Sequence, residues 1–204
     1  MPDSNNIKLY WCPQTRAQRV IWMLEEAALD YDPVVIDIRD PDRTPDTEFL
    51  SASPMGKVPA IIDGDVKLSE SAAICLYLAD KYPANKLAPS TDSSLRGQYL
   101  YWMLYTPAVV EPAMAEKFAG REPNTVQNGW GSFDLMIAAF EAALKNGPWI
   151  LGDTFSAADV MVGSSACFMQ QFGMLGDSEV LKAYADRCMK RPAYKKSITI
   201  NDAA

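Results

Sequence analysis

The chain has 204 residues, of which 49% are hydrophobic and 22% are charged, and its formal net charge is −7. This composition is typical of one globular domain or two small ones, and the acidic balance argues against nucleic acid as a partner, because phosphate binding needs a basic face. No window approaches the run of about 18 uncharged apolar residues that a membrane span requires, so we expect no membrane partner. The sequence has no histidine, which removes the usual zinc sites, a Ser-His-Asp triad and a histidine general base.

The cysteines and the first residues bear on the cellular compartment. Residues 1–6 carry no positive run followed by an apolar core, so we expect no secretory signal. Cys12, Cys75, Cys167 and Cys188 are scattered without a Cys-x-x-Cys pair, and the last three lie inside apolar helical patterns. A reducing cytosol fits this usage better than a disulfide framework. We therefore expect a cytoplasmic protein.

The first third of the chain alternates strand and helix patterns. Residues 7–11 alternate and are rich in β formers, residues 16–28 place apolar side chains at helical spacing, and residues 31–38 give a second strand. Together they predict a βαβ unit with parallel strands and a right-handed crossover. Residues 39–55 are charged and interrupted by prolines, and they predict only a short irregular helix around residues 47–50.

A hairpin led by proline follows. Pro59 begins an apolar run that ends at Asp63 and Gly64, which predicts a strand closed by a tight turn, with residues 66–68 as its partner. Proline gives no N–H to a ladder, and an X-Pro bond is the only place where a cis peptide is cheap. A cis bond after Val58 would leave the Val58 N–H and C=O able to pair with another peptide. Alone, the proline could equally serve only to start a strand.

The next helix is predicted over residues 69–81. Glu70 and Ser71 place an acid and a hydroxyl beside the exposed N–H groups of its first turn. Unpaired amides and the helix dipole both favour a carboxylate there, so the sequence predicts a local anion site. Taken by itself, the serine could also be a plain helix cap.

Strand patterns stop after this helix. Residues 82–92 hold the prolines and small polar residues of a linker, and only helical patterns follow. In residues 155–160, Ser156 is placed as an N-cap and Asp159 can reach back to it, which predicts a structural capping box rather than a catalytic acid. The predicted helices cover residues 93–114, 124–145, 158–168 and 179–190, with a last short one from Pro192.

Two of these motifs together resemble the glutathione transferase superfamily. The first is Lys57-Val58-Pro59-Ala60, and the second is Leu68-Ser69-Glu70-Ser71-Ala72-Ala73-Ile74. The capping sequence of residues 155–160 also occurs in the helical domain of that family. The resemblance implies an α/β thioredoxin-like N-terminal domain with a mixed four-stranded sheet in residues 1–81, a linker in residues 82–92 and an all-α C-terminal domain in residues 93–204.

The resemblance also implies how glutathione, the co-substrate, is held. In the family, the residue before the cis proline pairs through its backbone with the cysteinyl part of glutathione, and the Glu-Ser pair binds the γ-glutamyl group. These roles fall to Val58, Glu70 and Ser71, and Lys57 and Pro59 complete the expected binding set. No metal is implied. A homodimer is implied, flanked by helices that carry Tyr77 and Tyr101.

A glutathione transferase must favour the thiolate of glutathione, whose thiol has a pKa of about 8.5 when free. A hydroxyl aimed at sulfur and the N-terminus of a nearby helix both do so. The turn after the first strand is the place where the family supplies such a group. Thr15 is the first candidate, and it could equally be a plain cap of the helix. Arg16 could neutralise the thiolate or simply face solvent.

Cys12 supports a second chemistry. Cys12 and Pro13 resemble the omega-type transferases and glutaredoxins, in which a cysteine at the helix start forms a mixed disulfide with glutathione. Counting forward from Cys12 matches that pattern, whereas counting backward from residues 25–28 puts Gln14 at the cysteine position. A glutathione-dependent thiol reductase through Cys12 therefore stays open, as does a non-enzymatic binding module on the same fold.

The resemblance implies that the second substrate is an electrophilic, apolar small molecule and that the role is detoxification. We expect this substrate in an apolar cleft between the turn after the first strand and the long helix that follows the linker. The candidate lining residues are Tyr10, Trp11, Tyr101, Trp102, Met103, Tyr105 and Phe118.

Overall fold

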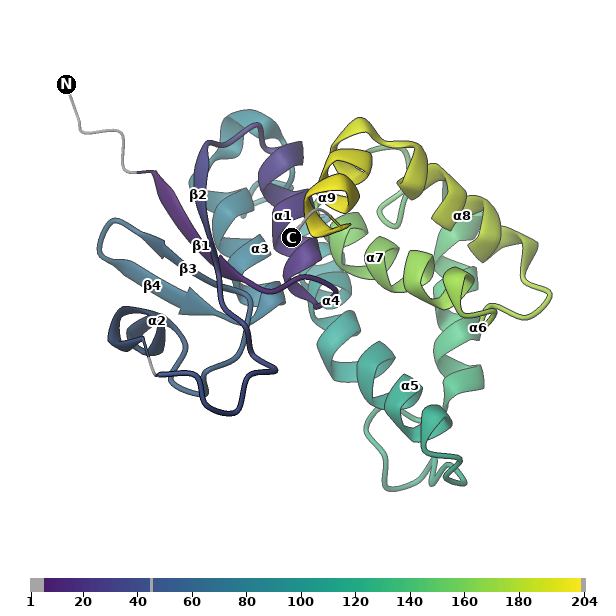
Figure 1. Ribbon diagram of the computed structural model, residues 1–204. Coiled ribbons are helices and arrows are strands. Elements are labelled where there is room, and N and C mark those ends of the chain that lie inside the picture. The colour runs from purple at the N-terminus through teal and green to yellow at the C-terminus, as the bar shows by residue number, and fades with distance from the viewer. Residues whose placement is uncertain (1–5, 45, 203–204) are drawn as a thin grey trace. The chain divides into compact units, whose positions relative to one another are not determined.

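The computed structural model describes residues 6–44 and 46–202 (Figure 1). Residues 1–5, on which the expectation about a secretory signal rests, lie outside the described residues. The described residues form two compact units, the first made of those up to residue 85 together with 192–202 and the second of residues 86–191. The expected division assigned all of residues 93–204 to the helical domain. It differs from this grouping because the last helix, α9 (Pro192–Asp202), packs against α1 (Ala17–Glu26) of the first unit.

The first unit is built on one mixed sheet. Within the described ranges it has four strands in the order β2-β1-β3-β4, namely β1 (Ile7–Trp11), β2 (Tyr31–Val35), β3 (Ala60–Asp63) and β4 (Val66–Ser69). Strand β1 runs parallel to β2 and antiparallel to β3, and β4 runs antiparallel to β3. The predicted parallel βαβ unit, hairpin and mixed four-stranded sheet are confirmed.

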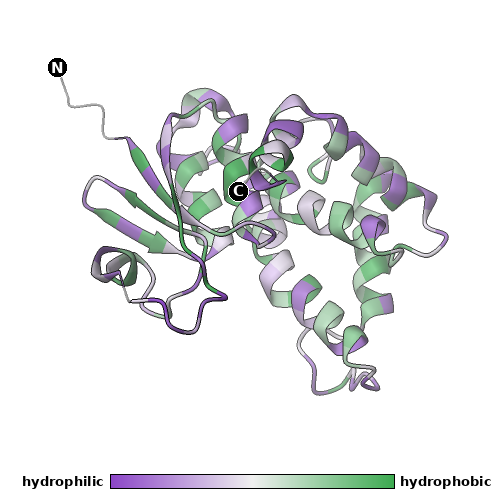
Figure 2. Cartoon of the chain, in the orientation of Figure 1, coloured by the Kyte–Doolittle hydropathy of each residue, from purple (hydrophilic) through white to green (hydrophobic). Residues whose placement is uncertain are grey.

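Helices fill in around this sheet. In the first unit they are α1, α2 (Thr47–Ala52), α3 (Ser71–Lys81), the 3-10 turn η1 (Pro83–Asn85) and α9. The apolar positions of α1 recur at helical spacing, and Val20, Ile21 and Leu24 are fully buried. Figure 2 shows the same pattern, with hydrophobic and hydrophilic colouring interleaved along α1.

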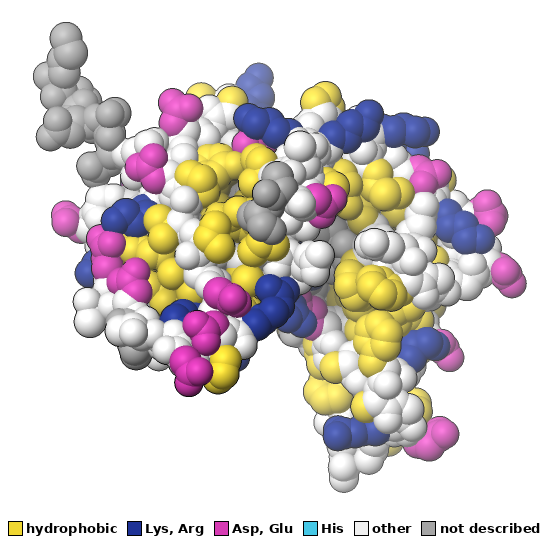
Figure 3. Space-filling view, in the orientation of Figure 1, with side chains coloured by type: hydrophobic (Ala, Val, Ile, Leu, Met, Phe, Trp, Pro, Cys, Tyr) yellow, Lys and Arg dark blue, Asp and Glu magenta, His cyan; other side chains and the backbone are white. Residues whose placement is uncertain are grey.

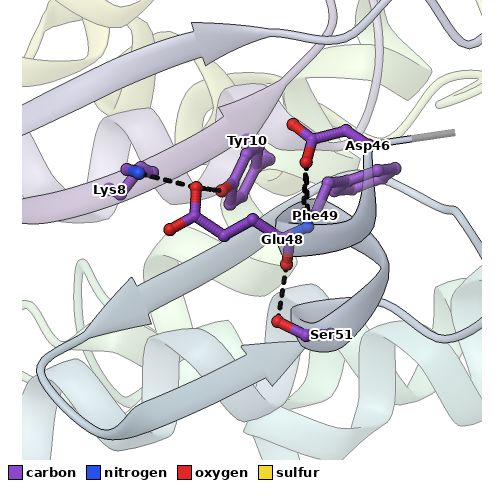
Figure 4. A network of polar contacts seen from close by, with 6 residues as sticks. All are labelled: Lys8, Tyr10, Asp46, Glu48, Phe49 and Ser51. Carbon is purple, nitrogen blue, oxygen red and sulfur yellow. Dashed lines mark hydrogen bonds and ion pairs between the residues drawn. The ribbon is translucent and has the colours of Figure 1, made fainter. Parts of the chain in front are cut away.

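Helix α2 is pinned to β1 by a polar contact (Figure 4). The Glu48 carboxylate accepts hydrogen bonds from Lys8 Nζ at 2.7 Å and from the Tyr10 hydroxyl at 2.8 Å, and the rings of Tyr10 and Phe49 lie 5.3 Å apart. Burial, together with the Glu48 carboxylate, raises the pKa of Tyr10. Tyr10 is 1% exposed and packs with Ile36, Phe49, Ala52 and Ala60. Its inclusion among the substrate-lining residues was therefore wrong, because its side chain is committed to the core beneath α2.

The second unit is helical throughout its described secondary structure, apart from an isolated bridge between Trp149 and Gly152. Its elements are α4 (Arg96–Tyr105), the π-helix η2 (Thr106–Val110), α5 (Glu111–Phe118), α6 (Phe133–Ala143), the 3-10 turn η3 (Leu144–Asn146), α7 (Ala157–Gln171) and α8 (Glu179–Lys190). None of the helices in the described part of the chain is long and apolar enough to cross a membrane.

The predicted capping box begins α7. Ser156 caps the helix, and Asp159, the third residue of the helix, accepts hydrogen bonds from the Ser156 backbone N–H and hydroxyl. Its other oxygen accepts from Ile150 N–H at 2.8 Å and the Tyr184 hydroxyl at 2.9 Å. All of these groups belong to the packing of the second unit, so Asp159 is structural, as predicted.

Candidate functional site

Three segments that are far apart in the sequence meet at one end of the sheet. Ala60 pairs with both Ser69 of β4 and Tyr10 of β1. Strand β1 ends at Trp11, β3 begins at Ala60 and β4 ends at Ser69, so the segments that follow β1, precede β3 and follow β4 all leave the sheet at this end. The turn after β1, the entry to β3 and the start of α3 therefore share this end of the sheet, as the site predicted from the motifs requires.

The entry to β3 is a loop with a fixed shape. The peptide bond between Val58 and Pro59 is cis, which is the conformation that the sequence analysis considered. The hydroxyl of Ser53, which is 1% exposed, accepts from Lys57 N–H at 3.0 Å and donates to Lys57 C=O at 2.7 Å. Gly56 closes the intervening turn at a φ of 64°, where glycine has no steric cost. Ser53 thus holds both backbone groups of the residue that precedes Val58.

The start of α3 is shaped by Glu70. This residue has a φ of 73°, outside the helical region, so the helix begins at Ser71 and not at Ser69 as predicted. The Glu70 side chain is exposed and makes no cap hydrogen bond to the helix. Ser71, the first residue of the helix, is 8% exposed. An acid and a hydroxyl therefore stand at the helix N-terminus, where a ligand with both an ammonium and a carboxylate finds partners of opposite charge.

The turn after β1, residues 12–16, contains the candidates for sulfur chemistry. The Thr15 hydroxyl donates to Cys12 C=O at 2.6 Å and accepts from Ala17 N–H at 3.2 Å. Its one proton is therefore used within the turn, and the group acts as a cap of α1. Arg16 is exposed and directly precedes α1 without a side-chain cap hydrogen bond.

Cys12 lies beneath an arginine that the sequence analysis did not single out. Arg39, in the loop after β2, donates from Nη1 to Cys12 Sγ at 3.1 Å and from Nη2 to Pro13 C=O at 2.9 Å. Figure 3 shows basic and acidic side chains intermingled along this part of the first unit. Cys12 is 1% exposed in this arrangement.

The remaining substrate-lining candidates divide by burial. Trp11, Trp102, Met103 and Tyr105 are buried, and the Tyr105 hydroxyl donates to Met136 C=O at 3.0 Å. Tyr101 and Phe118 are exposed by 54% and 61%. Trp11 belongs to the first unit and the others to the second, and the predicted cleft between the units stays a prediction.

Metal binding has no visible basis here. Among residues 6–44 and 46–202, no group of three or more His, Cys, Asp or Glu side chains could hold a metal ion. All four cysteines of the sequence are free and buried.

Sequence reasoning found the contiguous motifs and missed the residues that support them. Arg39 and Ser53 act from loop positions that no local pattern encodes. For residues 39–55 the sequence predicted only a short irregular helix around residues 47–50, which does not point to Arg39 or Ser53.

A mixed sheet of this topology, with a cis-proline entry to β3 and a separate helical unit, defines a thioredoxin-like α/β domain joined to an all-α domain. The predicted fold class is confirmed by the matching families and structures. Residues 9–86 match the family "Glutathione S-transferase, N-terminal domain" and residues 123–170 match "Glutathione S-transferase, C-terminal domain". The chain belongs to the glutathione S-transferase superfamily, as its motifs indicated.

Similar proteins include both kinds of chemistry considered above. The probable glutathione S-transferase GSTF2 of Oryza sativa subsp. japonica is 30% identical over 183 residues, covering 81% of this chain and 80% of that protein. The disulfide-bond oxidoreductase YfcG of Escherichia coli (strain K12) is 29% identical over 167 residues, covering 76% of each. A sphingomonad glutathione S-transferase complexed with glutathione superposes with a TM-score of 0.79 at 27% identity, covering 97% of this chain and 100% of that one.

Proposed function

We propose that the protein is a glutathione transferase that activates the thiol of glutathione for attack on an electrophilic, apolar small molecule. The observation that carries this proposal is the meeting of residues 12–16, Val58-Pro59 and Glu70-Ser71 at one end of the sheet. Membership of the superfamily supports it, as does the glutathione bound to a similar protein of known structure.

Glutathione is proposed to lie along this end of the sheet. The Val58 backbone pairs with the cysteinyl peptide, in a loop that Ser53 and Lys57 hold in place. The Glu70 carboxylate takes the γ-glutamyl ammonium, and the Ser71 hydroxyl with the first amides of α3 takes the γ-glutamyl carboxylate. The ligand therefore meets a helix N-terminus with its anionic group and an acid with its cationic group.

The sulfur of that ligand is proposed to reach the turn of residues 12–16. The N-terminus of α1 offers a partial positive charge, and Thr15 offers a hydroxyl that stabilises the thiolate once its bond to Cys12 C=O is released. Lowering the thiol pKa by about two units requires about 2.7 kcal/mol. One charge-assisted hydrogen bond with a helix terminus supplies an energy of that size.

A second candidate function is a glutathione-dependent thiol reductase, and the contact of Arg39 with Cys12 favours it. The Cys12 thiolate would attack the glutathione sulfur of a mixed disulfide, forming a Cys12–glutathione disulfide and releasing the other thiol as thiolate. A second glutathione thiolate would then attack the glutathione sulfur of that disulfide. This step yields oxidised glutathione and restores the Cys12 thiolate.

Binding is tested first, by titration calorimetry with glutathione. Ser71→Ala should weaken binding about tenfold, since one hydrogen bond to a charged group is worth about 1.5 kcal/mol or more. Ser51→Ala is the matched control, because Ser51 is an exposed serine on α2 whose hydroxyl donates to Glu48 C=O of the same helix. Wild-type protein that binds no glutathione would overturn the proposal and leave a binding module on this fold.

Activity then separates the two chemistries, with a panel of halogenated aromatics, peroxides and mixed disulfides. For a transferase, Thr15→Ala should reduce turnover of halogenated aromatics more than Cys12→Ser does. For a reductase, Cys12→Ser should abolish the reduction of mixed disulfides. Retention of full disulfide reduction by Cys12→Ser removes the second candidate.

Assembly and location complete the proposal. We propose a cytoplasmic homodimer, which family membership supports and with which four free buried cysteines are compatible. Leu100, Tyr101 and Leu104 of α4 are exposed by 38%, 54% and 52%, and they are the apolar residues offered for that contact. Sedimentation equilibrium of the wild-type protein tests it, and a monomer at micromolar concentration would contradict it.

A further inference from the structure

We propose that the C-terminal helix α9 positions the sulfur-binding turn, through a hydrogen bond from the backbone N–H of Gln14 to the side chain of Asn201. Asn201 is then a positioning residue of the enzyme, because it acts on the turn and not on the substrate. The proposal rests on the proposed function for its kinetic consequence, although the contact itself does not depend on it.

Helix α9 is joined to α1 by several different interactions. Gln18 Nε2 donates to Ser197 Oγ at 2.8 Å, and Lys196 Nζ pairs with the Glu25 carboxylate at 2.6 Å. The rings of Trp22 and Tyr194 meet edge to face with centroids 4.9 Å apart. These interactions run along the length of α1, so α9 is fixed on the same helix whose first turn follows residues 12–16.

The last of these interactions reaches beyond α1 into the turn itself. Gln14 N–H donates to Asn201 Oδ1 at 2.9 Å, across 187 positions of sequence. Asn201 is 8% exposed, so its oxygen is directed into the protein and not into solvent. Ser197 is 0% exposed, and it fixes the turn of α9 that precedes Asn201.

Gln14 has a conformation that needs external support. Its φ is 55°, in the left-handed region that non-glycine residues rarely adopt. Such a conformation persists only where the surroundings hold it, and it is found at sites where the backbone must present particular groups. The Gln14 backbone N–H donates to Asn201 Oδ1, so this residue is held by a group outside the turn.

The residues on either side of Gln14 are held by other contacts. Arg39 bonds Cys12 Sγ and Pro13 C=O, and Thr15 Oγ1 bonds Cys12 C=O. Gln14 therefore lies between two fixed residues, and its φ determines how Thr15 and the first amides of α1 are directed. Loss of the Asn201 bond should let Gln14 relax, and misdirect the groups that stabilise the thiolate.

Loss of the Asn201 bond should change the turnover of glutathione and not its affinity. The peptide part of glutathione is assigned to residues 58, 70 and 71, which α9 does not hold, so its affinity should change little. The thiolate is stabilised at the turn, so turnover should fall. Because one hydrogen bond is lost, the expected decrease in kcat is about tenfold.

The test uses Asn201→Leu, which has similar size and no acceptor, beside two comparison variants in the full chain. Asn201→Asp keeps the accepting oxygen and should retain kcat within about twofold. Thr199→Ala is the matched control on the exposed side of α9, where the Thr199 hydroxyl donates to Lys195 C=O of the same helix. Far-UV circular dichroism and thermal unfolding establish that each variant is folded.

Hydrogen exchange of the Gln14 amide reports the contact without any substrate. This amide should be protected in the wild type and exposed in Asn201→Leu.

A double substitution makes the test specific to Gln14. Glycine adopts positive φ without steric cost, so Gln14→Gly should need Asn201 less. Adding Asn201→Leu to Gln14→Gly should then lower kcat by less than about threefold, against about tenfold in the wild-type background. An equal loss in both backgrounds, an unchanged kcat in Asn201→Leu or an unprotected Gln14 amide in the wild type would each overturn the proposal. The wild-type protein could be inactive with glutathione while protection of the Gln14 amide still depends on Asn201. That result would refute the proposed function, but the hydrogen bond between Gln14 and Asn201 would stand.

Discussion

Asp159 gives the second unit a dependence on pH that is opposite to that of ordinary surface carboxylates. The side chain is 0% exposed and receives four hydrogen bonds, from Ile150, Tyr184 and both the backbone and the hydroxyl of Ser156. Burial raises the pKa of Asp159 from its ordinary value of 3.8 to about 6, and the hydrogen bonds limit that rise. The folded protein therefore holds this proton more tightly than the unfolded chain does.

The sign and the size of the effect follow from this difference. A raised carboxyl pKa contributes stability that is complete below pH 3.8 and is lost as the pH rises through about 6. Each pKa unit corresponds to about 1.4 kcal/mol, so the total loss is about 3 kcal/mol. Such a loss is a large part of the free energy of unfolding of a typical domain, which is about 5–15 kcal/mol.

Urea unfolding of the wild type and of Asp159→Asn, from about pH 4 to about pH 8, isolates this contribution. Asparagine does not titrate, so the difference in free energy of unfolding between wild type and variant should fall by about 3 kcal/mol across that range. Asp153→Asn, which changes an exposed acid nearby, should show no such trend. A difference that stays constant or increases with pH would mean that the four hydrogen bonds outweigh the cost of burying the charge, and would refute the reasoning.

Three further predictions concern the first unit. Ser53→Ala should weaken glutathione binding about tenfold in calorimetry, because both backbone groups of Lys57 lose their partner. An unchanged affinity would show that the loop before β3 does not need Ser53 to bind glutathione. Asp63→Asn should lower the free energy of unfolding by about 2 kcal/mol in urea. The buried carboxylate accepts hydrogen bonds from Tyr77 and Tyr82 and pairs with Lys81 at 2.8 Å. An unchanged free energy of unfolding would show that the charge of Asp63 is not needed. Tyr10→Phe should cost about 1 kcal/mol in the same assay by removing the bond to Glu48, and a loss of catalysis at unchanged stability would instead return Tyr10 to the active site.

Local pattern was sufficient to predict most of the fold. The alternating residues 7–11 and the helical spacing of residues 16–28 each determine a periodicity, and connection rules convert two such strands and a helix into a parallel pair. The grouping of α9 could not be predicted in this way. The side chains that α9 buries include Ser197 and Asn201, which are polar and give no local sign of burial. Its partner α1 is more than a hundred residues away in the sequence.

The candidate site divides in the same way. Val58, Pro59, Glu70 and Ser71 stand in short contiguous motifs, so they could be selected from the sequence, and their roles remain predictions. Arg39 and Asn201 act because a loop and a distant helix bring them to residues 12–16, and no spacing encodes that. Glu70 also shifted the start of α3 by two residues, since its positive φ cannot be read from its identity.

The first unit consists of two segments that are far apart in the sequence, so it can be completed only late in synthesis. The ribosome finishes strands β1 to β4 and helix α3 long before it reaches residue 192, so the indole of Trp22 waits for its partner Tyr194 until the entire helical unit has emerged. A polypeptide that stopped at residue 85 would leave that face of α1 permanently uncovered. We therefore expect the nascent first unit to be vulnerable to aggregation or to chaperone capture until the last helix arrives.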